Sequence, residues 1–191
     1  MNETYELLRT LTTPIVAITS KLGDKSNGMI ANSGMRASLS DVKPRVSVYV
    51  HKFNFTHDMI FESGRFVLHV LDASQMHVVT SLGFRSGRDG DKLGDLEFEI
   101  GKTGLPVLSG CFCHFECRVV NVMDTGGSTL FLGAVEHAGD TPDRTPLTPE
   151  HLRDAMPEEY RKLYLTNLSK AQAEATEMAD SMRAVVWRGL E

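Results

Sequence analysis

The sequence contains little cysteine and none of the signatures by which many enzymes bind nucleotides or metals. Its 191 residues include three cysteines, at positions 111, 113 and 117, an odd number that argues against a disulfide framework. A Walker glycine loop, a G-x-G-x-x-G fingerprint, an H-E-x-x-H helix and a nucleophile elbow are all absent. Any redox or group-transfer chemistry would therefore have to come from a bound cofactor.

Long apolar runs and an excess of basic charge are also lacking. No run of about 18 apolar residues occurs, and Asn2, Glu3 and Glu6 stand where a signal peptide would be basic and then apolar. The formal net charge of −5 gives no general affinity for nucleic acid or for anionic membranes. We therefore expect a cytoplasmic protein that binds neither, and in which any anion site is local.

Alternating apolar residues indicate a mainly β domain over residues 1–138. Short alternating or β-branched segments between turns predict six to seven strands with two short helices among them. The pattern is mainly antiparallel and is best closed as a small barrel. The expected strands cover about residues 15–20, 29–33, 45–53, 65–71, 96–100, 113–123 and 129–137, and the helices 56–64 and 74–82. Thr56 is the expected N-cap of the first helix, and Gly64 is its expected end.

The composition changes after residue 138. Residues 139–150 are rich in proline and predict a linker. Residues 151–191 form the expected C-terminal helical extension, because the stretch from Pro157 to Met182 is rich in Ala, Glu, Lys and Leu without internal glycine or proline. The apolar side of this extension either docks on the chain's own barrel or contributes to a homodimer interface.

Two polar stretches are candidates for a ligand site. The segment SNGMIANSGMRASLS, residues 26–40, can hydrogen-bond the polar edge of a planar heterocycle with its backbone and a phosphate with its hydroxyls. Its composition is also typical of an ordinary turn. The segment from Lys52 to Thr56 joins a lysine to a predicted helix start, where the helix dipole favours an anion, although such caps are common without any ligand.

Two further segments leave alternatives open. SLGFRSGRDGDKLGD, residues 81–95, carries basic and acidic side chains among four glycines, and is either a self-neutralised surface or a cradle for an anion. The three cysteines share one parity of a predicted strand, which favours a buried face. With His114 they would formally supply four zinc ligands, but we expect no metal.

In order and spacing, these stretches resemble the flavin reductase-like family of FMN-binding split barrels. The resemblance covers about residues 10–138, through TTPIVAITS, SNGMIANSGMRASLSDVKPRVSVYV, FTHDMIFESGRFVLHVLDASQ, LGFRSGRDGDKLG and GLPVLSGCFCHFECRVVNVMDTGGSTLFLGAVEH. It implies a Greek-key-like split β-barrel that binds FMN, with FAD possible, and reduces it with NADH or NADPH. It also implies a homodimer that serves a partner monooxygenase or an electron-transfer protein. The alternative is a flavoredoxin-like FMN carrier without direct NAD(P)H activity.

The resemblance implies a flavin site spread over several segments. The residues that the resemblance places along the isoalloxazine ring are Met29, Ile30, Ala31, Asn32 and Ser33. Near the ribityl phosphate it places Ser38, Leu39 and Ser40, with Lys52 and Thr56 in the phosphate site. The residues that the resemblance predicts to close over the flavin are Ser81, Gly83, Arg85, Ser86, Gly87, Arg88 and Lys92. One proline of the family's pair is replaced by Lys43, which could reshape the loop near the phosphate.

No side chain is expected to act as a catalytic acid or base. Hydride transfer to a flavin is a problem of positioning the two rings, so a missing catalytic dyad does not argue against a redox enzyme. His114 lies on the opposite parity from the three cysteines. It is a candidate for contact with the nicotinamide or an ordinary residue of the strand face.

Overall fold

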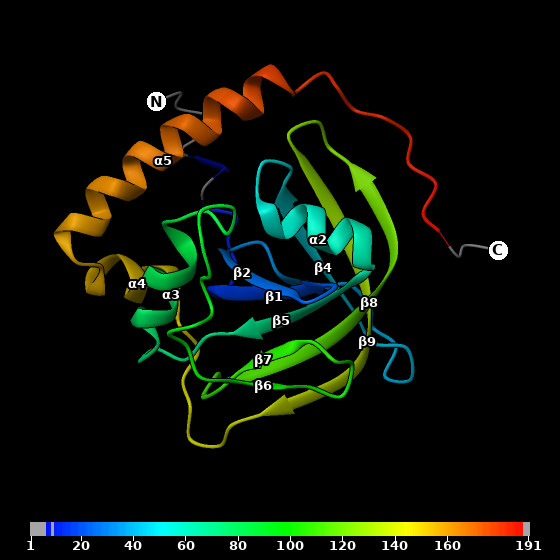
Figure 1. Ribbon diagram of the computed structural model, residues 1–191, viewed down its shortest axis with the longest axis horizontal. Helices are drawn as coiled ribbons and strands as arrows, with labels where there is room; N and C mark the ends of the chain where they lie inside the picture. The colour runs from blue at the N-terminus through cyan, green and yellow to red at the C-terminus, as the bar shows by residue number, and fades with distance from the viewer. Residues whose placement is uncertain (1–6, 9, 189–191) are drawn as a thin grey trace.

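A computed structural model describes residues 7, 8 and 10–188 of the chain (Figure 1). The strands are β1 (Val16–Leu22), β2 (Lys25–Ala31), β3 (Met35–Arg36), β4 (Arg45–His51), β5 (Arg65–Val70), β6 (Phe98–Ile100), β7 (Pro106–Leu108), β8 (Cys113–Asp124) and β9 (Ser128–Asp140). Seven of them form one antiparallel sheet in the order β2-β1-β5-β8-β9-β4-β3, and β6 pairs with β7 separately. The expected mainly β, antiparallel fold is confirmed.

The hairpin of β1 and β2 is longer than the sequence pattern predicts. Its turn is confined to Gly23 and Asp24, and Gly23 has a φ of 59°. Pairing of Ser20 with Asn27 continues the ladder through residues whose composition predicts a turn. Cross-strand pairing overrides the weak strand preference of serine, asparagine and glycine here. As a result Asn27 is a strand residue with its side chain buried.

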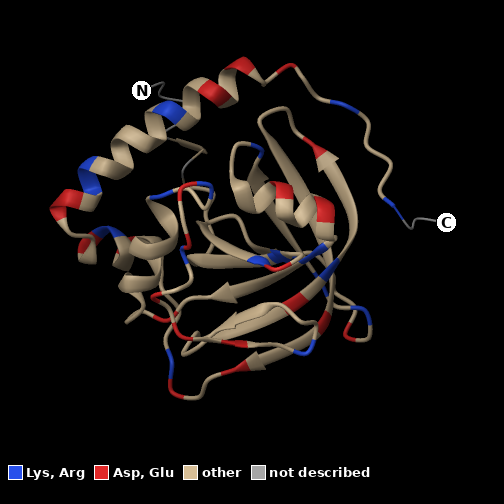
Figure 2. Ribbon diagram, viewed as in Figure 1, with Lys and Arg blue, Asp and Glu red and all other residues tan. Residues whose placement is uncertain are grey.

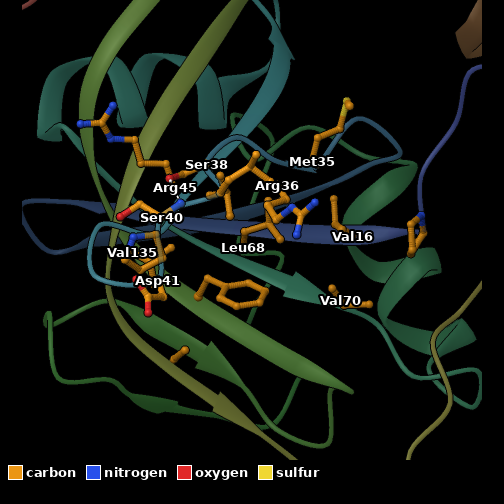
Figure 3. A pocket seen from close by; sticks show the side chains of 17 residues that line it. Val16, Met35, Arg36, Ser38, Ser40, Asp41, Arg45, Leu68, Val70 and Val135 are labelled. Carbon is orange, nitrogen blue, oxygen red and sulfur yellow. Dashed lines mark hydrogen bonds between the residues drawn. The ribbon is translucent and has the colours of Figure 1, made fainter.

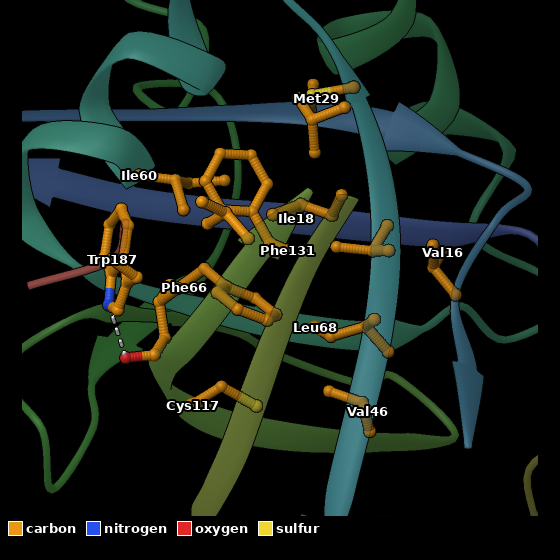
Figure 4. Packing of buried hydrophobic residues seen from close by; sticks show 14 residues of the cluster. Val16, Ile18, Met29, Val46, Ile60, Phe66, Leu68, Cys117, Phe131 and Trp187 are labelled. Atoms are coloured by element: carbon orange, nitrogen blue, oxygen red, sulfur yellow. Dashed lines mark hydrogen bonds between the residues drawn. The ribbon is translucent and has the colours of Figure 1, made fainter. Parts of the chain in front are cut away.

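The barrel core forms where the apolar residues of β4 meet those of β5 and β9. Val46, Val48 and Val50 are buried, as their alternation predicts, and they pack in one cluster with Phe66 and Phe131 (Figure 4). β5 was predicted to alternate as well, but both of its faces are covered. Its outer face carries Val67 and His69, which lie beneath β7, a three-residue strand too short to have been predicted.

Four helices are described in addition to the strands: α2 (Phe55–Ser63), α3 (Met76–Gly83), α4 (Pro149–Ala155) and α5 (Glu158–Glu177). α2 ends at Gly64, which has a φ of 68°, as predicted. The expected N-cap is wrong, because Asn54 occupies that position and Thr56 lies inside the first turn. In the described part of the chain, no helix is both long and apolar enough to cross a membrane.

The segment expected to be a linker is closely attached to the barrel. β9 continues to Asp140, and Leu147 is buried with its N–H donating to Leu71 O and its C=O accepting from Ile15 N. The division at residue 138 remains a prediction. Beyond α5, Trp187 anchors the tail on the barrel by donating from Nε1 to Val119 O at 3.1 Å (Figure 4).

His69 links three strands through its buried ring. Its Nδ1–H donates to Ala17 O at 3.3 Å, and its Nε2 accepts the N–H of Leu108 at 3.1 Å. These two bonds require the neutral imidazole, in which one nitrogen donates and the other accepts. Burial, which disfavours the charged ring, lowers the pKa of His69 to about 3.

We expect acid to destabilise the fold through His69. Its pKa in the folded chain lies below the ordinary value of 6.5, so the unfolded chain binds the proton first. Stability should therefore fall as the pH falls below about 6.5, by at most about 1.4 kcal/mol per pH unit for this group. Urea unfolding between about pH 7 and pH 5 should show a shallower pH dependence in His69→Gln than in the wild type. Parallel pH profiles for the two proteins would contradict this role.

Candidate functional site

Two cavities lie at opposite ends of β4. The first, of about 520 Å³, is mainly apolar and adjoins Arg45 and Val46 at the start of the strand (Figure 3). The second, of about 410 Å³, adjoins Phe53 and Asn54 just beyond its end and has a far more polar lining. We call them the apolar cavity and the polar cavity.

The polar cavity is built around a buried hydrogen bond between β2 and α2. Asn27 is only 2% exposed, and its Nδ2 donates to Thr56 Oγ1 at 2.9 Å. Gly87 rests directly on this pair, since a Cβ at that position would lie 2.3 Å from Asn27 Oδ1. Three separate segments of the chain, β2, α2 and the loop at Gly87, therefore meet at one point.

The start of α2 borders this cavity. Asn54 N–H donates to His51 O and His57 N–H donates to Asn54 O, which leaves the N–H groups of Phe55 and Thr56 without an acceptor in the helix. Asn54, Phe55 and Thr56 line the cavity, and Asn54 makes no side-chain hydrogen bond that would cap the helix. The first N–H groups of a helix have no intrahelical acceptor, and the helix dipole makes this end partially positive. Thr56, which was predicted for the phosphate site, lines this cavity, and its role there stays a prediction.

The buried side chain of Lys92 stabilises the 83–92 loop through hydrogen bonds to its backbone. Its Nζ donates to Leu82 O at 2.6 Å and to Arg85 O at 3.1 Å, and the residue is buried. Burial lowers the pKa of Lys92 to about 8, with a smaller contribution from the positive charge of Arg85, so the ammonium remains charged at neutral pH. The loop carries both basic and acidic residues (Figure 2) and forms an ordered wall of the cavity.

Lys52, predicted for the phosphate site, and Arg88, predicted to close over the flavin, are both engaged outside the polar cavity. Lys52 Nζ lies 2.7 Å from Asp124 Oδ1, and Arg88 donates to Asp58 Oδ2 at 2.7 Å and to Phe53 O at 2.8 Å. Neither residue is part of the cavity lining. In this structure both fix the segment that leads from β4 into α2.

The residues predicted along the isoalloxazine ring follow β2 away from the polar cavity. Met29 points into the barrel core, and Ile30 lies against Gly83. Ala31 is half-buried and Asn32 is exposed. Ser33 Oγ donates to Tyr49 O at 3.0 Å, which ties the segment just after β2 to β4. Ser81, Gly83, Arg85 and Ser86 lie at the end of α3 and in the adjoining loop.

Ser38, Leu39 and Ser40 border the apolar cavity and not the polar one (Figure 3). β4 separates the two places, and its seven residues at about 3.3 Å each span about 20 Å. Within a single chain, Ser38 and Ser40 therefore do not lie in the same cavity as Thr56. The inner wall of the apolar cavity comes from Val16, Leu68, Val70, Phe115 and Val135.

The remaining candidates lie elsewhere. His114 lines neither cavity, and its ring centroid is 6.3 Å from that of His69. Cys111 and Cys117 are buried, and burial raises the pKa of the Cys111 thiol to about 12. Within the described residues, no group of three or more His, Cys, Asp and Glu side chains could hold a metal ion.

Several residues of the polar cavity were not predicted. Asn27 belongs to the segment singled out in the sequence, but nothing in its local pattern shows that the side chain is buried at a junction. The contribution of α5 was also missed, although the spacing of its four lining residues is that of one helix face. These four are Asn167, Lys170, Ala171 and Glu174.

The fold is a split barrel with a polar cavity at the start of a helix. The chain belongs to the flavin reductase like domain family, which it matches over residues 8–154. The fold and the family expected from the sequence are thereby confirmed.

Individual relatives are consistent with this membership. The chain is 33% identical over 131 residues to FMN reductase (NADH) of Agrobacterium fabrum, covering 69% of this chain and 72% of the relative. It is 31% identical over 143 residues to the high molecular weight rubredoxin of Moorella thermoacetica, covering 74% of this chain and 62% of the relative. The NADH:FAD oxidoreductase of Streptomyces globisporus superposes with a TM-score of 0.68 at 26% identity, covering 76% of this chain and 87% of that one.

We expect Gly87→Ala to destabilise the protein. The new Cβ would displace the side chain of Asn27 and break its bond to Thr56, and such overpacking costs about 1 to 3 kcal/mol of unfolding free energy. Gly90→Ala is the matched control, because a Cβ there meets nothing within 4 Å. Urea unfolding of both variants tests the junction, and equal stability of the two would show that the contact is unimportant.

Proposed function

We propose that this chain is an NAD(P)H-dependent flavin reductase that binds FMN with its phosphate in the polar cavity. The observation that carries the proposal is the junction of Asn27, Thr56 and Gly87 at the uncapped start of α2, in a member of this family. A hydroxyl, free backbone N–H groups and a glycine that admits close approach are the groups that bind phosphate in proteins. FAD is the alternative flavin.

The residues of the chain would act by positioning the bound flavin and its phosphate. Thr56 and the first turn of α2 would hold the phosphate, and the edge of β2 from Met29 to Ser33 would lead the ligand along the split of the barrel. A bound flavin supplies a ring that accepts a hydride from the nicotinamide, and this transfer needs no acid or base from the protein. Contact between His114 and the nicotinamide remains a prediction.

Lys52, Arg88 and Lys92 are proposed to act on the phosphate through the segments that they hold. Lys92 and Arg88 together fix the loop beside Gly87, and Lys52 fixes the chain before α2. Each already donates at least one hydrogen bond within the chain, which fixes where its charge lies.

We expect NADH or NADPH to reduce the bound flavin of the protein once it has been loaded with FMN. Under anaerobic conditions, NADH or NADPH should bleach the visible absorbance of the bound flavin. Reduction by dithionite is the control, because it shows that the bound flavin can be reduced under these conditions. Binding of FMN without bleaching by either donor would reject the reductase and leave the flavoredoxin-like electron carrier. The same spectra with FAD test the choice of flavin.

A homodimer is the second part of the proposal. Leu39 and Val42, 89% and 80% exposed, lie in the loop that borders the apolar cavity, next to the exposed Met35. Several large apolar side chains exposed in one region of the chain favour an interaction site there. We further propose that the protein works in the cytoplasm and supplies a partner monooxygenase or an electron-transfer protein.

We expect Leu39→Glu with Val42→Glu to convert a dimer into a monomer, because two carboxylates would be buried without partners at the interface. Light scattering after size-exclusion chromatography measures the mass. Val186→Glu is the matched control, since this tail residue is 91% exposed and borders neither cavity. A wild-type protein with the mass of one chain would reject the dimer.

A further inference from the structure

One face of α5 lines the polar cavity although the helix lies outside the part of the chain that matches the family. The family match ends at residue 154, and α5 begins at Glu158. Asn167, Lys170, Ala171 and Glu174 are spaced so that they share one face of the helix, and all four line the cavity. The extension therefore supplies a wall that the family domain does not contain.

Contacts near both ends hold α5 in this position (Figure 1). Near its start, the ring of Tyr160 lies 5.0 Å from that of Phe84, in the loop that walls the cavity. Near its end, Ala175 rests on Gly127, where a Cβ would lie 3.0 Å from the Ala175 Cα. Beyond the helix, Trp187 anchors the tail on the barrel. The position of the helix is thus set by this chain itself.

The middle of α5 is not packed against the barrel. No residue of the helix is buried, although both of its ends are attached. The half-buried Asn167 and Ala171 face the cavity and not a protein core. The inner face of α5 is therefore placed to meet a ligand.

Lys170 is the cation that this wall offers. Three basic residues line the cavity, and Lys92 is already bonded to two carbonyl oxygens. Arg85 donates to Ser81 O and lies 3.8 Å from Asp95. Among the residues that the structure describes, Lys170 has neither an ion pair nor a hydrogen bond through its ammonium. The carboxylates of Asp89 and Glu174 also line the cavity and oppose an anion there.

We propose that α5 completes the phosphate site and that Lys170 is the cation which the C-terminal extension contributes to the bound phosphate. This inference rests on the proposed function, in which the start of α2 holds the phosphate. The recognised chemistry is a phosphate monoester attached to a flavin. Glu174, one turn further along the same face, lowers the positive potential at that position.

Titration of the full-length protein with FMN and with riboflavin, followed by flavin fluorescence, tests the proposal. Riboflavin lacks the phosphate, so Lys170→Ala should weaken FMN binding about five- to tenfold and leave riboflavin binding unchanged. Glu174→Gln should tighten FMN binding, because it removes a like charge. Lys162→Ala is the matched control. Lys162 lies on the same helix, is 77% exposed and pairs with Glu158 away from the cavity.

The outcomes separate this inference from the function on which it rests. Unchanged FMN affinity in Lys170→Ala, or equal weakening of FMN and riboflavin, would overturn the role of Lys170. A wild-type protein that binds FMN but is not reduced by nicotinamide would reject the reductase and leave this test valid. A wild-type protein that binds neither flavin would overturn both proposals.

Discussion

The buried hydrogen bond between Asn27 and Thr56 is the interaction on which the candidate site depends. It ties the second strand to the start of α2, and it forms the surface on which Gly87 rests. A buried polar pair costs free energy unless each partner is satisfied, so this bond sets the relative positions of the segments that meet there. Lys92 and Arg88 then fasten the loop around the same point. The shape of the polar cavity therefore depends on the contacts among Asn27, Thr56 and Gly87.

The barrel keeps two different environments apart. The polar cavity receives backbone donors from α2, whereas the apolar cavity is lined by the side chains that would otherwise complete the core, such as Leu68 and Phe115. β4 lies between them and separates Ser40 from Thr56. A ligand that contacts both places would need either a different path of the loop around Ser40 or a second copy of the chain. The exposed Leu39 and Val42 favour the second copy.

Much of the fold follows from local patterns. The alternation of Val46, Val48 and Val50 predicts their burial, and Gly64 predicts the end of α2, because these depend on strand geometry and on a left-handed backbone. The burial of both faces of β5 could not be predicted. It arises from β7, which is three residues long and becomes a strand only by pairing with β6. The N-cap was misplaced by two residues because Thr56, a good capping residue, is used instead by Asn27.

The sequence by itself determined the antiparallel barrel and the family, and it singled out candidate segments for the site, because turn glycines, strand alternation and motif spacing can be read along the chain. The tertiary structure decided which side chains in those segments meet. It paired Lys52 with Asp124 and Arg88 with Asp58, and it placed Ser38 and Ser40 at the apolar cavity. It also brought Lys170, from the C-terminal extension, to the cavity that Thr56 lines. These outcomes depend on contacts between residues far apart in the sequence, since an ammonium or guanidinium group binds the acceptor that packing places within reach.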